Sequence, residues 1–205
     1  MGSPISPRLL EIAKLVPINS TVLDIGTDHA YLPIYLSKNN ICKSIIASDI
    51  SKNALESGKK NLTKYNVKNV KLVLSDGLEN ITDAYDVITI SGMGTNTILK
   101  ILDNDRLPNN IVISSNNDLY LLRKSMNDKG YFIKNEVAIK DADKYYDIIL
   151  YEKGKEKLSL YQMLYGKSKN KDYYKYLFSK EKYIFYKSKK FKHLKNMVYL
   201  FFKSI

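Results

Sequence analysis

An acidic residue and a glycine stand at the end of an apolar run near the start of the chain, in the order Asp24-Ile25-Gly26. Gly26 lets a backbone turn come close to a ligand because it carries no Cβ. Asp24 can accept hydrogen bonds from loop amides or face a cationic group of a ligand. A dinucleotide fingerprint would need further glycines in this turn, but Asp28 and Ala30 stand there. A carboxylate repels a diphosphate, so the turn favours a ligand with an adenosine half and a positive centre; the alternative is a tight turn alone.

Two further acidic residues follow apolar runs. Asp49 lies 23 residues after Gly26, where an acidic side chain reaches both hydroxyls of a ribose. The alternative for Asp49 is an N-cap of the helix that starts near Ser51. Asp76-Gly77 closes a third run, where the carboxylate can accept from an adenine amino group and the glycine admits the ring.

Small residues close a fourth apolar run, in the order Ser91-Gly92-Met93-Gly94. Gly92 and Gly94 leave space on either side of Met93 for a substrate base beside the nucleotide ligand. Each of these motifs is weak by itself. Four of them in chain order, each at the end of an apolar run, predict one nucleotide site at one edge of a sheet.

Apolar runs alternate with helical stretches through the first 150 residues. The runs cover residues 21–25, 44–48, 70–74, 86–90 and 111–115, and the helical stretches cover residues 32–37, 51–65, 96–102 and 118–128. This alternation predicts a parallel sheet with helices on both faces. Two more runs, 131–139 and 145–152, have no helix between them and predict an antiparallel hairpin at the end of the sheet. The expected fold class is therefore α/β, a doubly wound, Rossmann-like, seven-stranded sheet followed by a helical C-terminal extension.

Charge and aromatic residues divide the chain near Gly154. The net charge of the chain is +12. Residues 1–150 hold 18 basic and 17 acidic side chains and are nearly neutral, whereas residues 151–205 hold 15 lysines and four acidic side chains. The second region also holds nine of the 17 tyrosines. We predict a sheet domain over residues 1–154 and a basic helical region over residues 155–205. Lysines interleaved with aromatic residues indicate contact with a phosphate backbone; the alternative is a solvated lysine face whose aromatic residues pack on the sheet domain.

The basic region has no glycine or proline between Lys171 and Lys203. This absence predicts one continuous helix of about 50 Å. The side chains expected to contact phosphates are Lys171, Lys175, Lys182 and Lys187.

Several classes of protein are disfavoured by composition. No stretch reaches the roughly 18 apolar residues of a membrane span, and no charged flank precedes an apolar run at the N-terminus. Cys42 is the single cysteine, which excludes an internal disulfide and a cysteine-built metal cage, and the two histidines cannot assemble a metal site. The sequence predicts a cytoplasmic protein with neither a membrane nor a metal as partner.

Three segments of the chain resemble the TrmK family of bacterial tRNA adenine-N1 methyltransferases, which belong to the class I methyltransferases that use S-adenosylmethionine. They are Asp-Ile-Gly-Thr-Asp-His-Ala-Tyr-Leu-Pro at residues 24–33, Ser-Asp-Gly-Leu-Glu at 75–79 and Ile-Thr-Ile-Ser-Gly-Met-Gly at 88–94. Within the first segment, the run Asp-His-Ala-Tyr-Leu-Pro at residues 28–33 is specific to that family rather than to the superfamily. The resemblance covers residues 5 to about 200 and implies methyl transfer from S-adenosylmethionine to N1 of adenine 22 in tRNA.

The chain departs from the family pattern in three places. The family usually has Gln-Pro-Asn after the fifth strand, where this chain has Ser114-Ser115-Asn116. A second glycine commonly follows Gly94, where this chain has Thr95. Family members end in an antiparallel coiled-coil hairpin, and we expect this chain to stop about where the second helix would begin, which leaves a shortened tail.

The resemblance and the motifs together give a set of expected cofactor contacts. The set is Asp24, Gly26, Asp28, Asp49, Ile50, Asp76, Gly77, Gly92 and Met93. Tyr31 and Gly94 are expected near the substrate base, Tyr31 by stacking, although a core tyrosine is the equal alternative.

Three residues are expected to take part in catalysis. Methyl transfer needs mainly the alignment of the reacting atoms, and a carboxylate stabilises the positive charge that develops on the ring. Asp28 is assigned this role, either by accepting from the adenine amino group or by facing the sulfonium. His29 is an orienting group, a base for the product's proton or a ring partner, unless it only caps the following helix. Asn116 hydrogen-bonds the base edge or is a plain turn asparagine.

Two other functions are compatible with the sequence. One is a methyltransferase for a small molecule or a protein, in which the basic region is incidental. The other is a non-catalytic RNA-binding module on the same fold. The intact set of Asp24, Gly26, Asp49 and Asp76 argues against the second.

Overall fold

The computed structural model describes residues 5–205 and contains a seven-stranded sheet in the order β3-β2-β1-β4-β5-β7-β6. Strands β1 to β5 are parallel, and β7 lies antiparallel between β5 and β6. The strands are β1 (Thr21–Ile25), β2 (Ser44–Asp49), β3 (Val70–Leu74), β4 (Val87–Ser91), β5 (Asn110–Ser114), β6 (Tyr131–Asp141) and β7 (Lys144–Lys153). The strand order reverses between β1 and β4, which is where ligands bind in open α/β sheets. The predicted doubly wound sheet with a terminal hairpin is confirmed.

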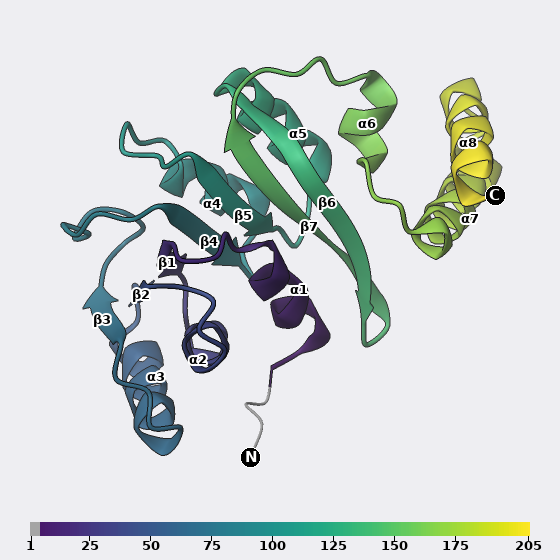
Figure 1. Ribbon diagram of the computed structural model, residues 1–205. Helices are drawn as coiled ribbons and strands as arrows, with labels where there is room; N and C mark the ends of the chain where they lie inside the picture. The colour runs from purple at the N-terminus through teal and green to yellow at the C-terminus, as the bar shows by residue number, and fades with distance from the viewer. Residues whose placement is uncertain (1–4) are drawn as a thin grey trace.

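Helices cover both faces of this sheet, with α1 and α2 in front of it and α4 and α5 behind it in Figure 1. The helices are α1 (Pro7–Leu15), α2 (Tyr31–Lys38), α3 (Lys52–Lys64), α4 (Thr95–Ile101), α5 (Leu119–Asp128), α6 (Leu160–Tyr165), α7 (Lys171–Ser188) and α8 (Phe191–Ser204). Two helices start at the residues that the sequence indicates. Ser51 Oγ accepts from the amide of Ala54, and Asp118 Oδ1 accepts from the amide of Leu121.

The strands are apolar on both faces because both faces are buried. In β1, Val22 packs with the α1 and α2 side chains, and Leu23 packs with those of α4 and α5. Val87 and Ile88 repeat this alternation in β4. These four side chains have no exposed surface. Their burial holds the carboxyl ends of the central strands in one fixed row.

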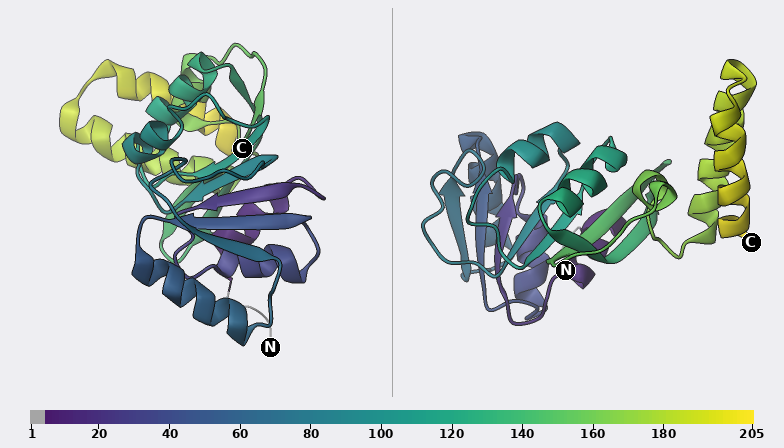
Figure 2. Two further views of the ribbon diagram at one scale, coloured as in Figure 1. Left: turned by 90° about the vertical axis from the view of Figure 1, so that its left-hand side faces the viewer. Right: turned by 90° about the horizontal axis from the view of Figure 1, so that it is seen from above.

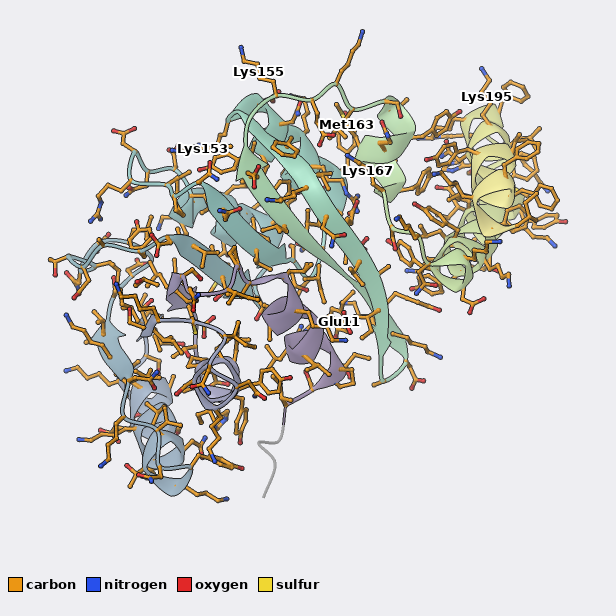
Figure 3. The ribbon with its side chains drawn as sticks, in the orientation of Figure 1. Glu11, Lys153, Lys155, Met163, Lys167 and Lys195 are labelled. Atoms are coloured by element: carbon orange, nitrogen blue, oxygen red, sulfur yellow. The ribbon has the colours of Figure 1, made fainter. Side chains whose placement is uncertain are left out.

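The C-terminal region is a helical hairpin, so the prediction of one continuous helix is wrong. Helix α7 ends at Ser188, Lys189 adopts a left-handed φ of 55°, and α8 folds back along α7. The expectation of a missing second helix is wrong as well, because α8 is that helix. Tyr174 and Leu200 form the buried contact between the two helices. Figure 2 shows this pair at the end of the molecule opposite α3, and Figure 3 shows Lys195 on α8.

A buried cluster of charges joins this hairpin to the sheet domain. Arg123 of α5 is fully buried and donates to Glu136 of β6 over 2.6 Å and to Asp147 of β7 over 3.1 Å. The same guanidinium donates to the carbonyl of Met163 in α6 over 3.1 Å. Tyr173 of α7 donates its hydroxyl to Asp147 over 2.7 Å. Three elements of the sheet domain and two tail helices therefore share one polar network.

Two features of residues 5–205 bear on the expected partners. No helix within residues 5–205 combines the length and apolar character that crossing a bilayer requires. Within the same residues, no group of three or more His, Cys, Asp or Glu side chains is placed to hold a metal ion.

Candidate active site

A pocket of about 300 Å³ opens at the carboxyl ends of β1, β2 and β4. Its walls are the turn after β1, Asp49 at the end of β2, the segment after β4, and the start of α1. Of the predicted residues it brings together Asp24, Gly26, Asp28, His29, Tyr31, Asp49, Gly92 and Met93. The pocket lies at the reversal of strand order, as expected for a nucleotide site.

Gly26 is required at the turn after β1 by conformation and by space. Its φ is 76°, and its amide donates to the carbonyl of Ser48 over 2.8 Å. A Cβ at this position would lie 2.2 Å from Cε of Met93. The Met93 side chain therefore covers the turn, and a larger residue at position 26 would displace it.

The next residues of this turn carry backbone strain. Asp28 and Ala30 have left-handed φ values of 46° and 58°, although neither is glycine. Each such residue costs about 1 kcal/mol or more. Two side chains hold the strained turn: Asp49 Oδ2 accepts from the Asp28 amide over 3.2 Å, and Asn61 Nδ2 donates to the carbonyl of His29 over 3.0 Å. Strain that neighbouring elements maintain in this way is typical of functional sites.

Two carboxylates contribute negative charge to the pocket. Asp24 is buried and accepts from Thr89 Oγ1 over 2.7 Å, and its burial, together with the nearby Asp49, raises its pKa. Asp49 also accepts from the Ser51 amide over 2.9 Å, while Ser51 itself is the N-cap of α3. The N-cap alternative for Asp49 is therefore wrong, and its carboxylate supports the turn. A cation that enters the pocket would stabilise the charged form of Asp24.

Asp28 and His29 lie at the mouth of the pocket. Their side chains are 69% and 49% exposed, with 3.7 Å between Asp28 Oδ2 and His29 Nε2. The His29 ring stacks on the half-buried Tyr31 with centroids 5.5 Å apart. Helix α2 has Ala30 as its N-cap and no side-chain cap bond, so the alternative that His29 caps this helix is wrong. A carboxylate and two aromatic rings are thus presented to whatever approaches the mouth.

Asn116 joins the segments after β4 and β5. Its amide donates to the carbonyl of Met93 over 2.9 Å, and its Nδ2 donates to the carbonyl of Gly92 over 2.8 Å. Beside it, Ser115 Oγ and Thr95 Oγ1 are 2.9 Å apart in a buried hydrogen bond. Two of the residues at which the chain departs from the family pattern therefore bond to each other and fix both segments.

Several predicted residues lie outside this pocket. Asp76 and Gly77 line a separate hollow of about 190 Å³ after β3. Ile50, which follows Asp49, is 69% exposed. Gly94 is the N-cap of α4 and abuts the Asn117 side chain. These residues share the carboxyl edge of the sheet with the pocket without lining it.

The four predicted lysines lie on α7, remote in sequence from the pocket walls, and all are exposed. Lys171 bonds the carbonyl of Ile205, and Lys175 pairs with Asp172 over 3.0 Å. Lys187 lies over the Tyr183 ring, 4.6 Å from its centroid. The remaining one is Lys182. Their ammonium groups are accessible to a polyanion.

Arg8 is a pocket residue that the sequence motifs miss. It lies on α1, and its guanidinium sits 4.7 Å from the centroid of the Tyr146 ring. Its Nε is buried and has no hydrogen-bond partner within residues 5–205. The available signal is composition, because the chain has three arginines and 30 lysines. Leu9 and Thr27 also line the pocket without having been singled out.

The comparisons with known proteins agree with this geometry. Residues 5–149 match a family model described as a methyltransferase domain. The structure of Mycoplasma capricolum TrmK in complex with S-adenosylhomocysteine aligns with a TM-score of 0.80 and 34% identity, over 96% of this chain and 94% of that one. The fold and the pocket define the chain as a class I methyltransferase.

Two further relatives narrow the assignment. A Streptococcus pneumoniae protein in complex with S-adenosyl-L-methionine aligns with a TM-score of 0.87 and 27% identity, over 98% of this chain and 100% of that one. The Bacillus subtilis tRNA (adenine(22)-N(1))-methyltransferase is 31% identical over 156 residues, which are 73% of this chain and 66% of that enzyme. The chain belongs to the TrmK family, and the resemblance inferred from its three segments is confirmed.

Proposed function

We propose that this protein transfers a methyl group from S-adenosylmethionine to N1 of adenine 22 in tRNA. The observation that carries the proposal is the pocket at the carboxyl edge of the sheet. Its inner wall combines the carboxylates of Asp24 and Asp49 with the guanidinium of Arg8, and its mouth presents Asp28 and His29. Membership of the TrmK family supports the same assignment.

The charges of the pocket complement those of the cofactor. S-adenosylmethionine carries an ammonium and a sulfonium, a carboxylate, and a ribose with two hydroxyls. The Asp49 carboxylate accepts hydrogen bonds from two backbone amides and retains further lone pairs for the ribose hydroxyls. Arg8, whose Nε lacks a partner among the described residues, is placed to bind the carboxylate. Asp24, whose pKa burial raises, faces the cationic part.

The remaining proposed contacts surround the adenine of the cofactor. Asp76 would accept from its amino group, and Gly77 leaves room beside the ring. The exposed side chain of Ile50 gives an apolar surface for one ring face. Gly92 and Met93 complete the site from the segment after β4.

When bound, S-adenosylmethionine would supply a methyl group whose carbon the lone pair of adenine N1 attacks, with S-adenosylhomocysteine as the leaving group. The protein contributes mainly by orienting the reacting groups. Asp28, at the mouth, stabilises the positive charge that develops on the ring or accepts from the amino group beside N1. His29 and Tyr31 offer stacked rings to the base. Asn116 fixes the opposite wall through Gly92 and presents its amide group to the base edge.

The lysines of α7 would hold the body of the tRNA. Residues 151–205 carry 15 lysines and four acids, while residues 1–150 are nearly neutral. Phosphate contacts therefore fall to the C-terminal region. The exposed lysines of α7 that we assign to this contact are Lys171, Lys175, Lys182 and Lys187.

The test is transfer of labelled methyl from S-adenosylmethionine to an unmodified tRNA transcript and to the same transcript with guanine in place of adenine 22. We expect label in the first and none in the second. Equal labelling of both transcripts would contradict the assigned position. Label in neither, with transfer to a protein or a small molecule instead, would contradict tRNA as the substrate.

A further inference from the structure

A second pocket of about 300 Å³ lies between the sheet domain and the C-terminal helices. Asn116 and Tyr120 contribute to it from the segment after β5 and from α5, and Lys144 and Tyr145 contribute from the start of β7. Tyr173 and other side chains of α6 and α7 close its far side. We call it the flanking pocket. Apart from Asn116, none of these residues takes part in the proposed methyl transfer.

The flanking pocket shares a wall with the methyl-transfer pocket. Asn116 lines the flanking pocket, and its Nδ2 donates over 2.8 Å to the carbonyl of Gly92, which lines the methyl-transfer pocket. Lys144 lies within 3.4 Å of the Asn116 carbonyl and 5.1 Å from the centroid of the Tyr146 ring. Arg8 of the methyl-transfer pocket stands over that same ring, at 4.7 Å. The two pockets are therefore adjacent across the segments that follow β4 and β5.

The lining combines aromatic rings and polar groups with the cation Lys144 and two carboxylates, of which Asp147 pairs with Arg123 and Asp118 accepts from the Leu121 amide. Tyr120 is 37% exposed and Tyr145 is half-buried. The Tyr145 ring is held by Tyr173 and Tyr176, with centroids 5.4 Å and 4.9 Å away. Such fixed rings are platforms for nucleobases, which stack regardless of their sequence. Lys144, which is exposed, adds a charge for a phosphate.

We propose that the flanking pocket binds the nucleobase next to the methylated adenine in the substrate RNA. This proposal rests on the proposed function. N1 lies on the pairing edge of adenine, so the target nucleotide must leave the base stack before it can react. Extrusion removes a stacking partner from the neighbouring base, and Tyr120 and Tyr145 replace that partner beside the active site. The surplus of lysine in residues 151–205 favours a polyanion as the occupant.

Substitutions that remove the rings and keep apolar side chains test the stacking. Tyr120→Leu and Tyr145→Leu should each raise the KM for tRNA about fivefold or more, with a smaller change in kcat. Tyr120→Phe and Tyr145→Phe keep the ring and should methylate tRNA with nearly the KM of the unmodified protein. The affinity for S-adenosylmethionine and the thermal unfolding midpoint should stay constant in all four variants. If a leucine variant loses cofactor affinity or thermal stability, the substrate experiment below tests the proposal in its place.

The substrate experiment uses tRNA with an abasic site on one or the other side of the target adenine. The unmodified protein should lose efficiency on one of these two substrates. On that substrate, the variant that combines Tyr120→Leu and Tyr145→Leu should lose no more efficiency than the missing base alone or the two substitutions alone cause. Independent, multiplying losses would overturn the proposal, as would leucine variants with an unchanged KM. These results require that the unmodified protein methylates intact tRNA. If it methylates no tRNA, the proposed function fails and the flanking pocket proposal fails with it.

Discussion

Arg8, Arg106 and Arg123 are the three arginines of a chain that has 30 lysines. Arg8 stands over a tyrosine ring at the active site, Arg106 donates to the carbonyls of Ile81 and Leu78, and Arg123 is fully buried between carboxylates. A planar guanidinium offers five N–H donors in a rigid fork, whereas an ammonium offers three donors at the end of a flexible stem. In a lysine-rich sequence, each arginine is therefore a signal of a structural or binding role.

The proposed ribose contact predicts the effect of Asp49→Ala. The change removes charge-assisted hydrogen bonds and should weaken binding of S-adenosylmethionine by about 1.5–3 kcal/mol, measured by isothermal titration calorimetry. Part of this loss comes from the turn, because Asp49 also accepts from the Asp28 amide. Asp83→Ala is the matched control, since Asp83 pairs with Lys71 beyond the pocket lining. An affinity within twofold of the unmodified protein would remove Asp49 from the site.

The proposed role of Asp28 separates chemistry from binding. Asp28→Asn keeps the size of the side chain and removes its charge, so turnover should fall tenfold or more, about 1.4 kcal/mol in the barrier. Cofactor affinity should be largely retained, because the backbone amide of Asp28, rather than its side chain, bonds to Asp49. Single-turnover methylation and calorimetry measure the two effects. A drop in affinity with unchanged turnover would make Asp28 a cofactor ligand only, and no change in either would leave His29 as the next candidate.

At the scale of elements, the sheet was predictable and the tail was not. Every predicted strand and helix of residues 21–152 is present within one or two residues at each end, because buried parallel strands are apolar on both faces and turns carry local signals. The break between α7 and α8 has no such signal, since Lys189 takes a left-handed conformation that usually selects glycine. Tyr174 packs against Leu200 between α7 and α8, and a contact so distant along the chain is not visible in local sequence.

The site divides in the same way. Asp24, Gly26 and Asp49 follow from their places at the ends of strands, and the pocket contains them. Arg8 lies on α1, and the position of α1 depends on packing against the β6–β7 strand hairpin. No spacing rule in the sequence therefore reveals Arg8. Ser115 and Thr95 are visible in the sequence only as two separate departures from a family pattern, and the structure brings their hydroxyls together.

The buried cluster that joins the tail to the sheet predicts a pH effect on stability. Burial raises the pKa of Asp147 to about 6, against the opposing effect of Arg123, and Glu136 and Tyr173 face it as well. Between the unfolded value of about 3.9 and the folded value, the native state binds more protons than the unfolded chain. The contribution of Asp147 to the free energy of unfolding is therefore full below that window and is lost as the pH rises through it.

Urea denaturation of the unmodified protein and Asp147→Asn across this pH range measures the effect. The asparagine cannot titrate. The unfolding free energy of the unmodified protein should therefore fall relative to that of the Asp147→Asn variant as the pH increases from about 4 to about 6.5. A constant difference across the range would show that Asp147 does not titrate there in the folded state.

At the scale of the whole molecule, the two ends of the chain have different charge. The sheet domain is nearly neutral and the hairpin of α7 and α8 carries the surplus of lysine at the end opposite α3. This arrangement predicts a log–log salt slope for tRNA binding of roughly −3 to −6. Glutamine at four lysines should reduce that slope by up to about 3 and weaken binding at low salt. The four are Lys171, Lys175, Lys182 and Lys187.

The matched control changes the same number of exposed lysines on α3. These are Lys52, Lys59, Lys60 and Lys64. Fluorescence anisotropy of labelled tRNA at several salt concentrations should give the control protein nearly the slope of the unmodified protein. Equal slopes for all three proteins would show that the four lysines of α7 do not contact the phosphates of tRNA. Substitution is preferable to deletion of residues 155–205, because α6 and α7 supply partners to the buried Arg123 cluster.

The proposed function is the transfer of a methyl group to N1 of one adenine in tRNA. Its most direct measurement is mass spectrometry of nucleosides and nuclease fragments from unmodified tRNA after incubation with the protein and S-adenosylmethionine. We expect 1-methyladenosine as the product, confined to the fragment that contains adenine 22. Methylation at another atom of adenine, in another fragment, or none in tRNA that folds correctly, would contradict it.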